Sequence, residues 1–167
     1  DGGFKEFEGV TLSLLYELNI SDCSFLTDAS ISCIAKSCPN LRSINLSFCC
    51  GLTDTSVDLL TVHCPHLRSI DLSYCGSAVS DTSVHWIASR LAGIERLSCR
   101  GCVRIGEQSI VSLATHAKSL RVLNVSSCKN IPAIVMQGLP KRWALLNNTP
   151  LDIYEDTVGS HVRRFTY

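Results

Sequence analysis

Leu41-Arg-Ser-Ile-Asn-Leu-Ser-Phe-Cys49 is a phrase that returns, with substitutions, four more times along the chain. The other copies span residues 15–23, 67–75, 94–102 and 120–128. The closing cysteines are 26, 26, 27 and 26 residues apart, at Cys23, Cys49, Cys75, Cys102 and Cys128. Self-similarity at a fixed period of this length is typical of stacked repeat proteins, in which each unit packs only on its neighbours.

Each unit begins with a strand pattern. The polar residues Ser43, Asn45 and Ser47 alternate with apolar neighbours. A period of two predicts a strand whose apolar side chains, such as Ile44 and Leu46, face a core. The polar side chains then line the opposite face, which faces solvent.

A helix pattern follows each strand. Thr53-Asp54 can begin a helix, because either side chain can accept hydrogen bonds from first-turn amides and the Asp charge suits the helix dipole. Val57, Leu60 and Thr61 then repeat at helical spacing and predict an inward face. Proline in Cys64-Pro65 ends the helix. The same signals recur at Thr27-Asp28, Cys38-Pro39 and Ser80-Asp81, and a weaker start lies at Gly106-Glu107.

Stacked strand–turn–helix units predict an α/β solenoid with parallel strands on the concave face and helices on the convex face. We expect about five repeats of 26–27 residues within residues 15–128. Residues 1–14 are interpreted as part of a preceding repeat or an N-terminal cover, in which Phe4 and Phe7 shield the first core layer. Residues 129–167 are interpreted as a C-terminal cap and tail, because Pro132-Ala133 replaces the helix-opening pair.

The block at residues 38–54, Cys-Pro-Asn-Leu-Arg-Ser-Ile-Asn-Leu-Ser-Phe-Cys-Cys-Gly-Leu-Thr-Asp, recurs at residues 64–81 with one inserted residue. It resembles the cysteine-containing leucine-rich repeat of leucine-rich-repeat F-box proteins and Amn1-type proteins. The resemblance covers residues 15 to about 131 and implies a leucine-rich-repeat solenoid, a segment of a curved horseshoe. In that family the repeats choose a substrate, and a separate F-box delivers it to a cullin–RING ubiquitin ligase. No F-box-like segment is visible, so contact with the ligase adaptor would use a region outside this chain.

Ten cysteines raise the alternatives of disulfides or metal. Strands about 4.8 Å apart do not forbid disulfides between neighbouring units. Five equivalent positions cannot all pair, however, and we interpret them as a ladder of reduced, buried thiols, which indicates a cytoplasmic or nuclear protein. Cys99-x-x-Cys102 has the spacing of a metal pair, although Cys99 takes an inward strand position. A metal or redox sensor at this pair remains a minor alternative.

Composition argues against several classes of function. The formal net charge is zero, which gives no indication of nucleic-acid binding. No apolar run approaches the roughly 20 residues of a membrane span, and no secretory signal is visible. The five histidines form no catalytic constellation, so we expect neither an enzyme nor a cofactor. The chain opens at Asp1 rather than Met, which suggests a piece of a longer protein.

The outward positions of the strands are the candidate partner site. Arginine and aromatic residues are favoured anchors in protein interfaces. The candidates on the concave face are Arg42, Phe48, Arg68, Tyr74, Arg96, Arg100 and Arg121. Such a stripe suits an acidic or phosphorylated peptide. The alternative is that Arg42, Arg68 and Arg121 are solvated residues of a consensus Leu-Arg step.

Arg96 and Arg100 interrupt their columns, where the other units have different residues, and are the more specific candidates. The leading hypothesis is a protein-interaction module, namely the substrate-recognition repeats of an F-box-type ligase subunit. The alternative is a structural repeat subunit that braces a large assembly and has no part in ubiquitination.

Overall fold

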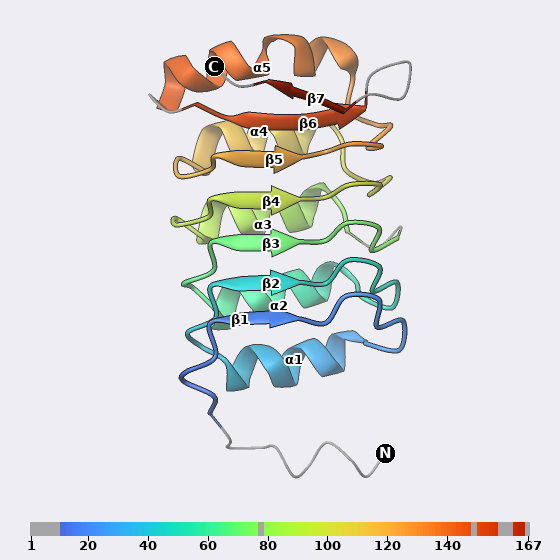
Figure 1. Ribbon diagram of the computed structural model, residues 1–167, viewed down its shortest axis with the longest axis vertical. Coiled ribbons are helices and arrows are strands. Elements are labelled where there is room, and N and C mark those ends of the chain that lie inside the picture. Colours follow the sequence, from blue (N-terminus) through green and yellow to red (C-terminus); the bar gives the residue numbers. More distant parts are fainter. Residues whose placement is uncertain (1–10, 77–78, 148–149, 157–161, 166–167) are drawn as a thin grey trace.

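The computed structural model describes residues 11–76, 79–147, 150–156 and 162–165. Strands and helices alternate along the chain, with one strand–helix pair in each repeat (Figure 1). The elements are β1 (Glu17–Asn19), α1 (Asp28–Ser37), β2 (Ser43–Asn45), α2 (Asp54–His63), β3 (Ser69–Asp71), α3 (Asp81–Arg90), β4 (Arg96–Ser98), α4 (Glu107–His116), β5 (Val122–Asn124), α5 (Ala133–Asn147), β6 (Asp152–Asp156) and β7 (Val162–Phe165). The predicted solenoid is confirmed.

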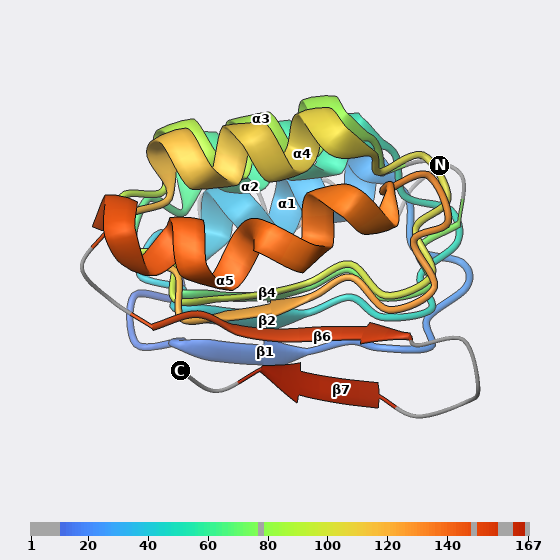
Figure 2. The ribbon, with the colours of Figure 1, turned by 90° about the horizontal axis from the view of Figure 1, so that it is seen from above.

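The strands form one sheet in the order β1 to β7. Strands β1 to β6 are parallel, and β7 pairs antiparallel with β6. Ile44 pairs with Leu18 on one side and with Ile70 on the other, so equivalent residues of successive repeats lie side by side. The helices cover one face of the sheet and leave the other open, and β7 lies on the side away from the helices (Figure 2).

The local sequence patterns explain where these strands and helices begin and end. Ile44 and Leu46 are buried, whereas their polar neighbours are half-buried. Thr53 is the N-cap of α2, and its hydroxyl accepts a hydrogen bond from the Thr55 N–H at 3.1 Å. The helix ends at Cys64, whose N–H donates to the Leu60 carbonyl. The predicted strand face, helix start and helix stop are therefore confirmed.

The core lies between the two layers and runs continuously along the stack. Each repeat contributes the same inward positions from its strand, turn and helix. In the second repeat the buried residues include Leu41, Ile44, Leu46, Leu52, Val57 and Leu60. Cys99 takes the place of Leu46 in the fourth repeat and is 1% exposed, as its inward position predicted.

The cysteine ladder is buried in four of its five positions. Cys75 Sγ donates to the Leu46 carbonyl at 3.0 Å, and Cys49, Cys102 and Cys128 make the equivalent bond to the preceding repeat. Cys23 is exposed, so its predicted burial is wrong. The reason is that each buried thiol sits against the strand of the preceding repeat, and no described strand precedes β1.

The cysteines that precede proline at the helix ends form a second column of buried thiols. The sequence indicated them only as part of a helix stop. Cys38 and Cys64 are buried where the helices end. Cys64 Sγ contacts the Cys38 carbonyl at 3.4 Å and the Ala35 carbonyl at 3.6 Å. These residues therefore also join adjacent repeats at the ends of their helices.

The C-terminal segment continues the solenoid with altered elements. The 15-residue α5 buries Trp143, and β6 adds a further parallel strand with Leu151 and Ile153 in the core. The boundary between repeats and cap at 128/129 stays a prediction. Phe4 and Phe7 lie outside the described residues.

Candidate partner-binding face

The open face of the sheet, which we call the concave face, has one polar column that is engaged in folding. Asn45 Oδ1 accepts a hydrogen bond from the Ser47 N–H at 2.9 Å, and Asp71 Oδ1 accepts one from Ser73 at 2.8 Å. The Oδ1 atoms of Asn19 and Asn124 accept the equivalent bond from the N–H two residues later. An Asn or Asp side chain that bonds two residues ahead forms an Asx turn. These four side chains therefore turn the chain after β1, β2, β3 and β5.

Two aromatic residues project where β2 and β3 end. The rings of Phe48 and Tyr74 are stacked, with centroids 4.8 Å apart and planes inclined by 16°. The guanidinium carbon of Arg100 lies 5.5 Å from the centroid of the Tyr74 ring, a cation–π contact. We call Phe48, Tyr74 and Arg100 the aromatic ledge. Phe48 remains 49% exposed, so the ledge offers apolar surface to a partner.

The ledge residues hold a backbone conformation that is unfavourable for large side chains. The φ angles of Phe48 and Tyr74 are 63° and 56°, in the left-handed region. The equivalent residues are Asp22, Gly101 and Ser127, also with positive φ. A bulky residue there is uncommon, and such strain concentrates at functional sites. The left-handed turn thus recurs in all five repeats, whereas only two of them place an aromatic side chain there.

Gly101 makes room for the ledge. A Cβ atom built on Gly101 would lie 2.6 Å from two atoms of the Tyr74 ring. The ring of Tyr74 therefore lies directly over the turn of the following repeat. Any side chain at position 101 would displace it.

A cleft of about 350 Å³ opens where the strands begin, among the segments that lead from each helix to the next strand. We call it the arginine cleft. Its lining residues are Tyr16, Asn40, Arg42, Pro65, His66, Arg68 and Gly93. Arg42 lies over the Tyr16 ring, 5.0 Å from its centroid, and Arg68 Nη1 lies 3.2 Å from Glu95 Oε1. Two of the predicted arginines thus share one cavity.

A second cavity of about 300 Å³ lies over β3 to β6 on the concave face. Arg96 lines it together with Asp71 and Asn124. Tyr154 of β6 also lines this cavity, although it was not among the candidates predicted from the sequence. The alternation of buried Leu151 and Ile153 around Asp152 could have identified this strand. Arg96 and Arg100 therefore lie in different local surroundings, Arg100 on the ledge and Arg96 in this cavity.

Arg121 is exposed but lines none of these cavities. The structure thus divides the seven predicted residues into four local settings. Phe48, Tyr74 and Arg100 form the ledge, Arg42 and Arg68 share a cleft, and Arg96 and Arg121 lie apart. Whether these residues bind a partner stays a prediction.

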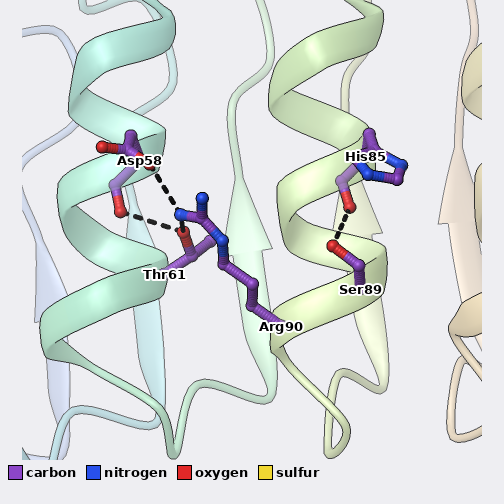
Figure 3. Close-up of polar contacts among 5 residues, drawn as sticks. All are labelled: Asp58, Thr61, His85, Ser89 and Arg90. Carbon is purple, nitrogen blue, oxygen red and sulfur yellow. Dashed lines mark hydrogen bonds and ion pairs between the residues drawn. The ribbon is translucent and has the colours of Figure 1, made fainter.

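The helix layer carries polar contacts that join neighbouring repeats. Arg90 of α3 bonds to the Asp58 carboxylate at 2.6 Å and to the Thr61 hydroxyl at 3.1 Å (Figure 3). The Ser89 hydroxyl donates to the His85 carbonyl, and the His85 and His116 rings meet edge to face with centroids 5.8 Å apart. The Arg90 and His85–His116 contacts join neighbouring helices, whereas the bond between Ser89 and His85 lies within α3.

Burial makes the inner thiols poor nucleophiles. Burial raises the pKa of Cys75 and Cys102 to about 12 each, and holds that of Cys99 well above its ordinary value. Because the thiolate is the reactive and metal-binding form, these positions favour protonated packing groups. Among the described residues, no three His, Cys, Asp or Glu side chains are grouped to hold a metal ion. None of the helices in that part of the chain is long and apolar enough to cross a bilayer.

The comparisons with known proteins agree with this architecture. The family model described as Leucine Rich repeat matches residues 37–60 and 63–81, so the chain contains leucine-rich repeats. No curated protein sequence matches the chain. Among solved structures, the chain is similar to one from the complex of Rad7 and Elc1 in yeast, with 24% identity and a TM-score of 0.58. The match covers 77% of this chain and 32% of that one, so the chain spans about a third of its length.

Proposed function

We propose that the chain is a protein-interaction module that binds its partner on the concave face. More specifically, it serves as the substrate-recognition repeats of an F-box-type subunit of a cullin–RING ubiquitin ligase. The observation that carries the proposal is the aromatic ledge. All five repeats have the left-handed turn with Asp, Gly or Ser sufficing at three of them, and only Phe48 and Tyr74 place a large ring there. Exposed aromatic and arginine side chains on a rigid sheet are the composition of an interface anchor.

Two further observations support the proposal. Leucine-rich repeats are typically interaction modules without catalytic activity, and their stacked strands present an extended binding surface. The similar solved structure is a complex of two proteins, so the fold occurs there within an assembly. The ligase role itself comes from the resemblance of residues 38–54 to F-box protein repeats, and the adaptor would bind outside this chain.

The first experiment is mass spectrometry of proteins that copurify with the tagged, full-length parent protein from its native cells. We expect a cullin and its adaptor in the eluate, together with candidate substrates. Stoichiometric partners without any ligase subunit would contradict the ligase role and favour a structural brace.

A second experiment tests the concave face directly. Arg96→Glu combined with Arg100→Glu should abolish capture of the partner, because both side chains are exposed and both charges are reversed. The thermal melt should remain unchanged, since exposed side chains contribute little to stability. Lys129→Glu is a matched control on an exposed residue outside the ledge, the arginine cleft and the cavity over β3 to β6. Undisturbed capture by the double variant would exclude this part of the face.

A further inference from the structure

The two arginines of the arginine cleft lean in opposite directions. Arg42 and Arg68 occupy the same position of successive repeats, one residue before β2 and β3. Neighbouring strands lie about 4.8 Å apart, so two side chains that stood upright would bring like charges together. Instead Arg42 turns back onto the Tyr16 ring of the preceding repeat, while Arg68 turns forward to Glu95 of the following repeat. The cleft opens between them.

The cleft is rich in hydrogen-bond donors and lacks a carboxylate. None of its seven lining residues is acidic. In the described part of the chain, no carboxylate forms an ion pair with Arg42. A guanidinium has five N–H donors, and the contact with Glu95 uses one nitrogen of Arg68. His66 adds a further nitrogen at the rim. The two arginines therefore keep most of their donors for a ligand.

The ion pair between Arg68 and Glu95 can be replaced easily by a contact with another anion. Its side chains are 59% and 37% exposed, and a solvent-exposed ion pair contributes little to stability. Glu95 therefore holds the Arg68 guanidinium at the wall of the cleft without closing it. An incoming anion can share or replace this contact at small cost.

We propose that the arginine cleft binds a phosphoryl group carried by a side chain of the protein partner. A carboxylate has two oxygens, which one guanidinium fork satisfies. A phosphoryl group has three acceptor oxygens and nearly twice the charge at neutral pH, so it can engage two forks that approach from opposite sides. This inference rests on the proposed function, since it assigns the chemistry of a partner that binds the same face.

The test measures binding of fluorescent degenerate peptide pools to the whole chain by anisotropy. One pool has a central phosphoserine, the second has serine and the third has glutamate. We expect the phosphoserine pool to bind at least about tenfold more tightly than the other two, from charge-assisted hydrogen bonds to two guanidiniums. Equal binding of the phosphoserine and serine pools would overturn the proposal.

Three variants locate the site. Arg42→Gln and Arg68→Gln should each weaken binding of the phosphoserine pool about tenfold, because each removes one charged fork. Arg121→Gln is the matched control, since Arg121 is the exposed equivalent in the fifth repeat and lies outside the cleft. Binding that is unchanged in both cleft variants, or that falls equally in the control, would place the phosphoryl group elsewhere.

A gain of binding is also expected. Glu95→Gln removes the carboxylate that competes for Arg68, and should tighten binding of the phosphoserine pool about 2- to 5-fold, the range of an exposed ion pair. Weaker binding would mean that Glu95 is needed to position the arginine, which contradicts the exchange described above.

Two outcomes distinguish this proposal from a site for free phosphate and from the proposed function alone. Inorganic phosphate that competes fully at the concentration of the peptide pool would show a site for the free anion and overturn the peptide ligand. Failure of the phosphoserine pool to bind, with partner capture still sensitive to the Arg96 and Arg100 reversals, would overturn this inference and leave the proposed function standing.

Discussion

The Asp54 carboxylate binds Ser80, the residue that begins the next helix along the stack. It accepts a hydrogen bond from the Ser80 N–H at 2.9 Å and another from the Ser80 hydroxyl at 2.8 Å. The Ser83 hydroxyl also donates to it. Asp28 binds Thr53 in the same way, and Asp81 accepts hydrogen bonds from the Gly106 N–H and the Ser109 hydroxyl. In each Thr/Ser-Asp pair, therefore, the second residue joins its repeat to the following one.

Replacing Asp54 with alanine should destabilise the protein by about 2–3 kcal/mol, because it removes charge-assisted bonds and leaves the buried Ser83 hydroxyl without its acceptor. The measurement is urea unfolding of the whole chain. Asp58→Ala is the control, since Asp58 forms an exposed ion pair with Arg90 that contributes under about 1 kcal/mol. Equal losses in the two variants would contradict an inter-repeat role for Asp54.

The carboxyl group of Asp28 predicts a dependence of stability on pH. Burial alone would raise its pKa, but hydrogen bonds from Ser56 and Thr53 outweigh burial and hold the pKa below the ordinary value of 3.8. A group whose folded-state pKa is depressed stabilises the fold above the unfolded pKa, and this contribution disappears as pH falls through the lower folded value.

We therefore expect the stability difference between the wild type and Asp28→Asn to be constant above about pH 5 and to shrink below pH 3.8, as the unfolded-state carboxyl and then the folded-state one become protonated. Chemical unfolding at a series of pH values measures this difference. A difference that grows on acidification would show that the carboxylate destabilises the fold.

The repeat architecture could be predicted because its signals are local and recur. The polar–apolar alternation around Ile44 and the Thr53-Asp54 helix start act within a few residues, and repetition at a fixed period strengthens each of them. The stacking of Phe48 on Tyr74 was also predictable, because parallel strands in register place equivalent turn residues side by side.

Three other features, which depend on the particular side chain or strand in the neighbouring repeat, could not be predicted. The sequence places Asp54 at a helix start but does not show that its acceptor oxygens face the next repeat. The burial of Cys23 was wrongly predicted because the phrase is the same in every unit, whereas burial depends on a preceding strand. The opposite leaning of Arg42 and Arg68 follows from Tyr16 and Glu95, which break their own column.

The thiols should divide into two classes of reactivity. Cys23 and Cys50 are exposed, whereas burial raises the pKa of Cys64 to about 11 and that of Cys75 to about 12. We expect iodoacetamide at pH 8 to label the two exposed residues quickly and the two buried ones only after unfolding in urea. Mass spectrometry of digested samples taken over time gives the rates. Early labelling of Cys75 in the native protein would contradict its buried position in the ladder.

Phe48→Asn should separate folding from partner binding. Asparagine tolerates a positive φ, which relieves about 1 kcal/mol of strain, while loss of the stacked contact with Tyr74 costs about 0.5–1.5 kcal/mol. The two effects oppose each other, so stability should change by less than about 1 kcal/mol. Affinity for the copurified partner should fall about tenfold or more if the ledge anchors it.

The control is Asp22→Asn, which changes the same turn position of the first repeat, away from the ledge. Urea unfolding and calorimetric titration with the partner measure stability and affinity on the same samples. A loss of stability above about 3 kcal/mol in Phe48→Asn would mark the aromatic ring as part of the core, since that is the cost of emptying a buried aromatic site. Unchanged affinity would show that the partner does not contact the ledge, and the strain at Phe48 would then need another cause.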